Sequence, residues 1–169
     1  VDQALDGGVN FFDTADIYGR GISEERLGNF LGKKRQHAVI ATKFGVRQDS
    51  SGKTFYDNSP EWLDKALDAS LNRLNTDYID LYQVHYWDNQ ISLEKIFEHL
   101  DRKCQEGKIR FYGVTNVDLG KLEIKLPKKL ASFSFEYSLA NREKETIVKE
   151  IIEKNRLRIM CVKSFLIKL

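Results

Sequence analysis

The segment Asn10–Gly28, NFFDTADIYGRGISEERLG, contains the features from which the fold can be predicted. The residues just before Asp13 are apolar and aromatic, as in an interior strand, and Ser23 with the acidic residues behind it is typical of a helix N-terminus. Asp13 and Tyr18 therefore fall at or just beyond the carboxyl end of a strand. In parallel α/β proteins, reactive side chains usually lie at that end.

Outward from this segment, apolar runs alternate with amphipathic ones. The expected strands are 9–12, 38–44, 79–86, 109–115, 132–138 and 158–164, and the expected helices are 60–74 with Ser59 as N-cap, 93–107 and 143–154. Val1–Gly8 reads as the end of a further helix. A βα repeat predicts a parallel sheet of about six strands with flanking helices, as a doubly wound sheet or a (β/α)8 barrel. A barrel normally needs about 250 residues and eight strands.

Composition limits the function classes. The chain has 169 residues and a net charge of +2, which gives no reason to expect nucleic acid or a membrane surface as partner. No apolar run approaches the roughly 20 residues of a membrane span. The densest basic patch, 33–37, is expected to be a solvated helix C-terminus. Cys104 and Cys161 are expected to be reduced thiols of a cytoplasmic protein, and no metal site is expected.

Four polar residues fall at successive strand ends. Asp13 and Tyr18 follow the first strand, Lys43 ends the second and His85 ends the third. Lys43 would lower the pKa of the Tyr18 phenol, and Asp13 would pair with Lys43 to keep it charged and oriented. Tyr18 and His85 would then polarise a carbonyl oxygen and deliver a proton while a hydride reaches the carbon.

With these residues in view, the sequence resembles the aldo-keto reductase family. The matching segments are FFDTADIYGRGISEERLG, ATKFG, YIDLYQVHYWD, GKIRFYGVTN and FEYSLANRE, which cover most of the chain. The resemblance implies one partial (β/α)8 barrel domain over 1–169 that reduces aldehydes or ketones with NADPH, with NAD as the alternative cofactor. It also implies that Asp13, Tyr18, Lys43 and His85 are catalytic and that Tyr18 is the proton donor.

The resemblance extends to cofactor binding, with departures. Thr115 and Asn116 match the family's Ser-Asn pair that holds the nicotinamide carboxamide. Ser134 replaces a family Gln that holds the same group, and Lys163 stands where the family has an aromatic that stacks on the nicotinamide. The resemblance therefore implies a cofactor site that is weaker than the family's. The two edges of an incomplete sheet also predict self-association.

Two other functions compete with carbonyl reduction. The chain could be a non-catalytic binding or regulatory module on the same fold, because fold alone does not settle function. It could also be a Schiff-base lyase that uses Lys43 as nucleophile and Tyr18 as acid and base. The long ordered matches rank the lyase last.

Overall fold

A parallel sheet forms the centre of the molecule. The computed structural model describes residues 1–117, 126–136, 146 and 158–162. The sheet's strands are β1 (Phe11–Asp13), β2 (Val39–Phe44), β5 (Ile79–Val84), β6 (Ile109–Thr115), β7 (Leu130–Glu136) and β8 (Arg158–Val162), and they pair in that order. Each expected strand is confirmed, with small differences at the ends. Consecutive parallel strands in sequence order are the arrangement of a (β/α)8 barrel wall.

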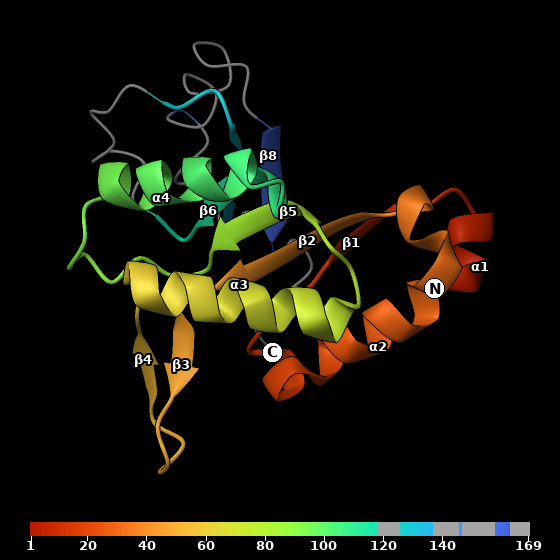
Figure 1. Cartoon of the computed structure of the whole chain (residues 1–169), viewed down its shortest axis with the longest axis horizontal. Coiled ribbons are helices and arrows are strands. Elements are labelled where there is room, and N and C mark those ends of the chain that lie inside the picture. Colours follow the sequence, from red (N-terminus) through yellow and green to blue (C-terminus); the bar gives the residue numbers. More distant parts are fainter. Residues whose placement is uncertain (118–125, 137–145, 147–157, 163–169) are drawn as a thin grey trace.

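The helices of the described residues are α1 (Asp2–Asp6), α2 (Ile22–Leu31), α3 (Pro60–Leu74) and α4 (Leu93–Gln105). The expected bounds of α3 are confirmed, and the Ser59 side chain caps the helix by accepting a hydrogen bond from the Trp62 amide. Figure 1 shows α3 and α4 side by side on one face of the sheet. A doubly wound sheet would carry helices on both faces. The fold is therefore an incomplete (β/α)8 barrel.

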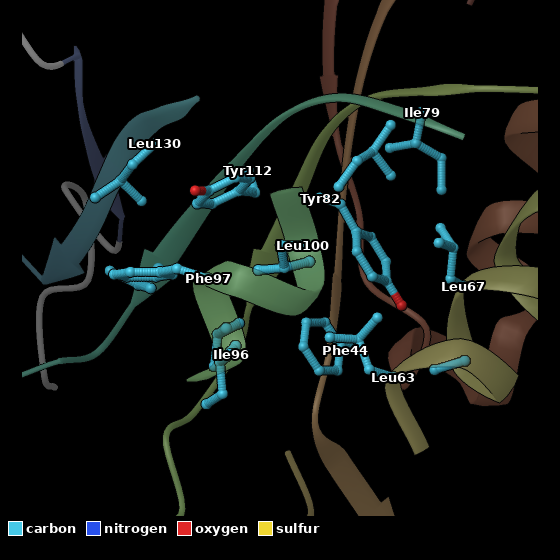
Figure 2. Packing of buried hydrophobic residues seen from close by; sticks show 14 of the residues in the cluster. Phe44, Leu63, Leu67, Ile79, Tyr82, Ile96, Phe97, Leu100, Tyr112 and Leu130 are labelled. Carbon is cyan, nitrogen blue, oxygen red and sulfur yellow. The ribbon is translucent and has the colours of Figure 1, made fainter. Parts of the chain in front are cut away.

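The core lies between the sheet and these helices (Figure 2). Phe44 of β2 stacks on Tyr82 of β5 with 4.9 Å between ring centroids, and Phe97 of α4 stacks on Tyr112 of β6 at 5.5 Å. All four side chains are buried, and each such burial contributes about 1.5–3 kcal/mol. Since side chains alternate along a strand, the packing of Phe44 against the helices turns Lys43 to the opposite face of the sheet.

A hairpin of β3 (Val46–Gln48) and β4 (Thr54–Tyr56) follows β2 and was not expected from the sequence. It projects away from the sheet beside the N-terminal end of α3 (Figure 1). Arg47 of β3 forms an ion pair with Asp57 at 2.6 Å, which ties the hairpin to the segment that leads into α3.

The helix N-terminus predicted around Ser23 is confirmed, since α2 begins at Ile22. Its N-cap is Gly21, with φ of 95°, and the Ser23 hydroxyl hydrogen-bonds the Thr14 hydroxyl at 2.8 Å. The basic patch forms a 3-10 helix, η2 (Gly32–His37), directly after α2, and its residues are exposed as expected except Arg35, whose side chain is 12% exposed. The Arg35 guanidinium donates to the backbone oxygens of Ala38 and Tyr78 and forms an ion pair with Asp80 at 2.7 Å.

Two other expectations lie outside the described residues: the helix at 143–154, apart from residue 146, and the placement of Lys163. Among the residues that the structure describes, no helix is long and apolar enough to cross a membrane.

Candidate active site

Asp13 and Lys43 lie on neighbouring strands, as the register of β1 with β2 requires. The Lys43 Nζ donates to Asp13 Oδ1 at 2.7 Å and to the backbone oxygen of Thr14 at 2.8 Å. The Lys43 side chain is only 3% exposed, whereas that of Asp13 is 32% exposed. A buried ammonium group is therefore held by one carboxylate and one carbonyl at the carboxyl end of the strands.

Tyr18 opens the 3-10 helix η1 (Tyr18–Gly21), which joins β1 to α2. The backbone reverses there through left-handed residues, with φ of 59° at Gly19 and 55° at Arg20. Because of this turn, the Tyr18 ring lies 5.6 Å from the Lys43 Nζ, measured to the ring centroid. Tyr18 is 44% exposed, so a small molecule can reach its hydroxyl.

His85 directly follows β5, and its amide donates to the Phe44 backbone oxygen at 2.9 Å. Its ring lies 5.9 Å from the Tyr18 ring in an edge-to-face arrangement. The His85 ring also stacks on Tyr86 at 5.3 Å, and Tyr86 stacks on Tyr56 of β4 at 5.1 Å. The unexpected hairpin thus contributes an aromatic wall beside His85.

The sequence-predicted residues Asp13, Tyr18, Lys43 and His85 are therefore brought together. Their electrostatics differ from expectation at one point. Burial, with a smaller contribution from the Lys43 charge, lowers the pKa of His85 to about 4, so the imidazole is neutral near pH 7. Burial, then the charge of Asp13, raises the pKa of Tyr18, and the expectation that Lys43 would lower it is wrong. The physical reason is that burial, the largest influence, disfavours the charged phenolate, and the Asp13 carboxylate acts in the same direction against the Lys43 charge.

The side chains of Thr115, the last residue of β6, and of Asn116, just beyond it, also reach this end of the sheet. The Thr115 hydroxyl and the Asn116 Nδ2 both donate to the His85 backbone oxygen, the latter at 3.1 Å. Asn116 has φ of 55° and is exposed. Its amide oxygen accepts no hydrogen bond from the described residues and is open to a ligand's N–H group.

Ser134 of β7 lies opposite Thr115 in the register and is buried. Its hydroxyl oxygen accepts from the Gln83 Nε2 at 3.0 Å, and the same Nε2 reaches the Ser132 hydroxyl at 3.0 Å. Sequence reasoning missed Gln83. Its position in the sequence could have indicated it, because Gln83 lies two residues before His85. In an extended chain, side chains two residues apart point to the same face. A hydroxyl retains one proton to donate, so Ser134 and Asn116 together offer a donor and an acceptor, which suits a carboxamide.

A second cluster that the sequence reasoning missed lies behind the site. Glu24 of α2 is fully buried; its carboxylate accepts from the Thr42 hydroxyl at 2.6 Å and from Arg73 Nε at 2.7 Å. Thr42 precedes Lys43, and a Cβ at Gly21 would lie 2.6 Å from the Arg73 side chain. The signal in the sequence was Arg73 among the apolar positions of α3. This cluster fixes the turn that carries Tyr18 against β2 and α3.

No group of His, Cys, Asp and Glu among the described residues is arranged to hold a metal ion. Cys104 is a free thiol, and burial raises its pKa to about 11, so it is not a reactive thiolate near neutral pH.

The chain is similar in sequence to known proteins. The profile described as "Aldo/keto reductase family" matches residues 1–166. The chain is 35% identical over 147 residues to the uncharacterized oxidoreductase YqkF of Bacillus subtilis (strain 168), an alignment that covers 86% of this chain and 48% of YqkF. The chain spans about half the length of this relative.

Solved structures are similar as well. The glycerol dehydrogenase AKR11B4 of Gluconobacter oxydans superposes with a TM-score of 0.84 at 34% identity, over 94% of this chain and 50% of that one. An aldo/keto reductase of Klebsiella pneumoniae, solved in complex with NADP and acetate, superposes with a TM-score of 0.77 at 28% identity. That match covers 94% of this chain and 54% of the Klebsiella protein.

Proposed function

Because the chain belongs to the aldo/keto reductase family, we propose that it reduces aldehydes or ketones to alcohols, with NADPH as the hydride donor. NADPH is favoured over NADH because the similar Klebsiella protein was solved with NADP. The observation that carries the proposal is the 2.7 Å ion pair between the buried Lys43 and the partly exposed Asp13, beside the exposed Tyr18 and the neutral His85.

The roles of the side chains follow from their charge states. Tyr18 is protonated near neutral pH, because its pKa is raised, and its hydroxyl can donate a proton to a carbonyl oxygen. His85 is neutral and can donate an N–H hydrogen bond to the same oxygen. As Tyr18 loses its proton, the Lys43 ammonium stabilises the negative charge that develops on the phenol. Asp13 holds that ammonium in place.

The cofactor would be held at the same end of the sheet. The nicotinamide supplies the hydride, and its carboxamide would lie at Asn116 and Ser134, with Thr115 supporting the loop through the His85 carbonyl. Since the Ser134 side chain is short and its oxygen already accepts from Gln83, we expect weaker cofactor binding than a longer amide would give.

The test compares NADPH oxidation by the chain with that by Tyr18→Phe, using an aromatic aldehyde. We expect the variant to lose turnover by about 10²–10⁴-fold, because only the donated proton is removed. Tyr78→Phe is the matched control, since the Tyr78 ring packs beneath Arg35 and Arg110, away from Lys43. Equal turnover in the parent and Tyr18→Phe would refute the assigned donor.

The second candidate is a non-catalytic binding module on this fold. It is favoured by the engaged Ser134 hydroxyl. A folded chain that binds NADPH without turnover would support it. A Schiff-base lyase is disfavoured, because the Lys43 nitrogen donates to both Asp13 and Thr14. Borohydride trapping with a carbonyl compound tests that alternative.

A further inference from the structure

A hollow of about 480 Å³ lies outside the candidate active site. One wall is a face of α3 that includes Trp62, Lys65 and Arg73, and the other walls are the turn between β1 and α2 and the β3–β4 hairpin. The outer wall of this pocket is held in place in two ways. Strand β3 pairs with β4, and Arg47 forms an ion pair with Asp57. Asp13, Tyr18, Lys43 and His85 do not line it.

The pocket carries an excess of positive charge. Its cationic residues are Arg20, Arg47, Lys65 and Arg73, and its acidic residues are Asp16 and Asp49. The Asp49 carboxylate is engaged within its own turn, where it accepts from the Ser51 hydroxyl at 2.6 Å and the Lys53 amide at 3.0 Å. Burial, then the nearby Glu24 charge, raises the pKa of Asp16 to about 7, so this acid is only partly ionised near neutral pH.

The cations divide into two kinds. Arg47 and Arg73 are held by Asp57 and Glu24, at 2.6 Å and 2.7 Å. Arg20 and Lys65 are exposed and form no ion pair with any residue that the structure describes. The hollow is therefore lined by two exposed cations that have no ion-pair partner among the described residues, while its other two cations are held in ion pairs. Such an arrangement attracts an anion, and Arg and Lys both bind phosphate and carboxylate groups.

The floor of the pocket combines apolar side chains with the planar Arg47 guanidinium. The Arg47 guanidinium lies over the Trp62 ring at 3.9 Å, and Ile17, Val46 and Ala66 complete this surface. A flat organic group can pack on such a floor while its charged end remains near the rim. The pocket is also large enough for a small ligand, since ligand sites have volumes of about 300–1,000 Å³.

We propose that this pocket binds a small organic anion, with a flat aromatic body stacked on the Arg47 guanidinium that covers Trp62 and a phosphate or carboxylate head held by Arg20 and Lys65. Its site is separate from the one assigned to carbonyl reduction and does not depend on that activity. Arg20 lies on the same turn as Tyr18, so the ligand contacts the segment that places the expected proton donor.

The probe is phenyl phosphate, and the readout is the fluorescence of Trp62 in a Trp87→Phe background. Trp87 packs elsewhere, with its indole N–H donating to the Ile91 oxygen, so its removal leaves Trp62 as the reporter. We expect a saturable fluorescence change that weakens as salt is added, because the head is held by exposed charges. A fluorescence change that never saturates would overturn the proposal.

Lys65→Met keeps most of the side-chain length and removes the charge. We expect it to weaken phenyl phosphate binding about tenfold, the loss expected for a charge-assisted contact. Lys95→Met, an exposed substitution on α4, is the matched control and should leave the affinity unchanged. Equal affinity in Lys65→Met and the control would overturn the assignment of the head to Lys65.

Benzoate and inorganic phosphate distinguish the sources of the head group. If phenyl phosphate binds more tightly than benzoate, the charged group of the ligand is assigned as a phosphate ester. If benzoate binds more tightly, it is assigned as a carboxylate. Inorganic phosphate, which lacks the flat body, should compete only weakly; competition as strong as that of phenyl phosphate would overturn the role of the floor. Tyr18→Phe should bind the probe as the parent does, so failure of the proposed reductase activity is measured separately.

Discussion

At the scale of single residues, the Asp13 carboxylate is, after burial, the main influence that raises the pKa of Tyr18. Asp13 raises the pKa of Tyr18 and pairs with Lys43, whose charge would otherwise favour the phenolate. Asp13→Asn keeps the side-chain shape and removes the negative charge, so the pKa of Tyr18 should fall. The measurement is an ultraviolet titration of phenolate in Asp13→Asn and in the parent, each compared with its Tyr18→Phe counterpart. A Tyr18 pKa that does not change, or that rises, in Asp13→Asn would contradict this electrostatic account.

Asp16 should make stability depend on pH in an unusual direction. Its pKa is raised from 3.8 to about 7 in the folded chain, and its buried Oδ1 has no hydrogen-bond partner among the described residues. Between these values the unfolded chain gives up a proton that the folded chain keeps, so stability is lost as pH rises from about 4 to 7. Asp16→Asn should therefore stabilise the fold above pH 7, by on the order of 3 kcal/mol, and have little effect near pH 4.

Urea unfolding of the parent and Asp16→Asn across this pH range gives the measurement. His85 acts in the opposite direction, because its pKa is lowered from 6.5 to about 4 and the folded chain resists its protonation as pH falls. The parent and Asp16→Asn both contain His85, so its contribution cancels. The difference between their unfolding free energies therefore reports on Asp16 alone. A difference that is constant with pH would refute a raised Asp16 pKa.

The residue pairs that sequence reasoning predicted share one property. Asp13 and Lys43 were placed together because each ends a parallel strand, and neighbouring strand ends must meet. The Gln83–Ser134 hydrogen bond joins positions 51 residues apart and depends on the register of β5, β6 and β7, which no local pattern encodes. The pKa of Tyr18 was mispredicted because it depends on burial and on two opposite charges at once.

At the scale of elements, the crossing of α2 and α3 depends on Gly28. A Cβ at this position would lie 2.5 Å from the Leu74 backbone oxygen, and a backbone atom cannot move aside as a flexible side chain can. Gly28→Ala should therefore destabilise the fold by about 1–3 kcal/mol, although alanine is the better helix former. Thermal or urea unfolding measures this effect. Asn29→Ala, an exposed change on the same helix, should be close to neutral, and similar losses in both variants would refute the close-approach argument.

Elements with strong periodicity were predictable, and short irregular ones were not. The α3 bounds follow from Ser59, Pro60 and the leucine spacing, which are local signals. The strands β3 and β4 were missed because each has three residues, and all three of β4 are exposed, so the hairpin lacks the alternation that marks a strand. Ser23 and its acidic neighbours correctly indicated where α2 begins, but the capping residue could not be predicted, because a left-handed glycine takes the N-cap position.

At the scale of the whole molecule, the inner face of the sheet exposes apolar side chains at the end opposite to Lys43. A hollow of about 320 Å³ there is lined by residues of neighbouring strands, among them Phe11, Val39, Leu81 and Phe111. Phe11 and Phe111 are 41% and 44% exposed. Apolar surface in contact with water favours association, and β1 and β8 also present open edges in the described sheet.

We therefore expect the chain to self-associate through this inner face. Sedimentation velocity should show a species that grows with protein concentration, and Phe111→Ser should weaken the association about tenfold or more, because burying one Phe contributes about 1.5–3 kcal/mol. Phe30→Ser is the matched control, since Phe30 is 64% exposed on α2 and does not line the hollow. A monomer at every concentration would refute self-association, and equal weakening by both substitutions would show that the inner face is not the contact.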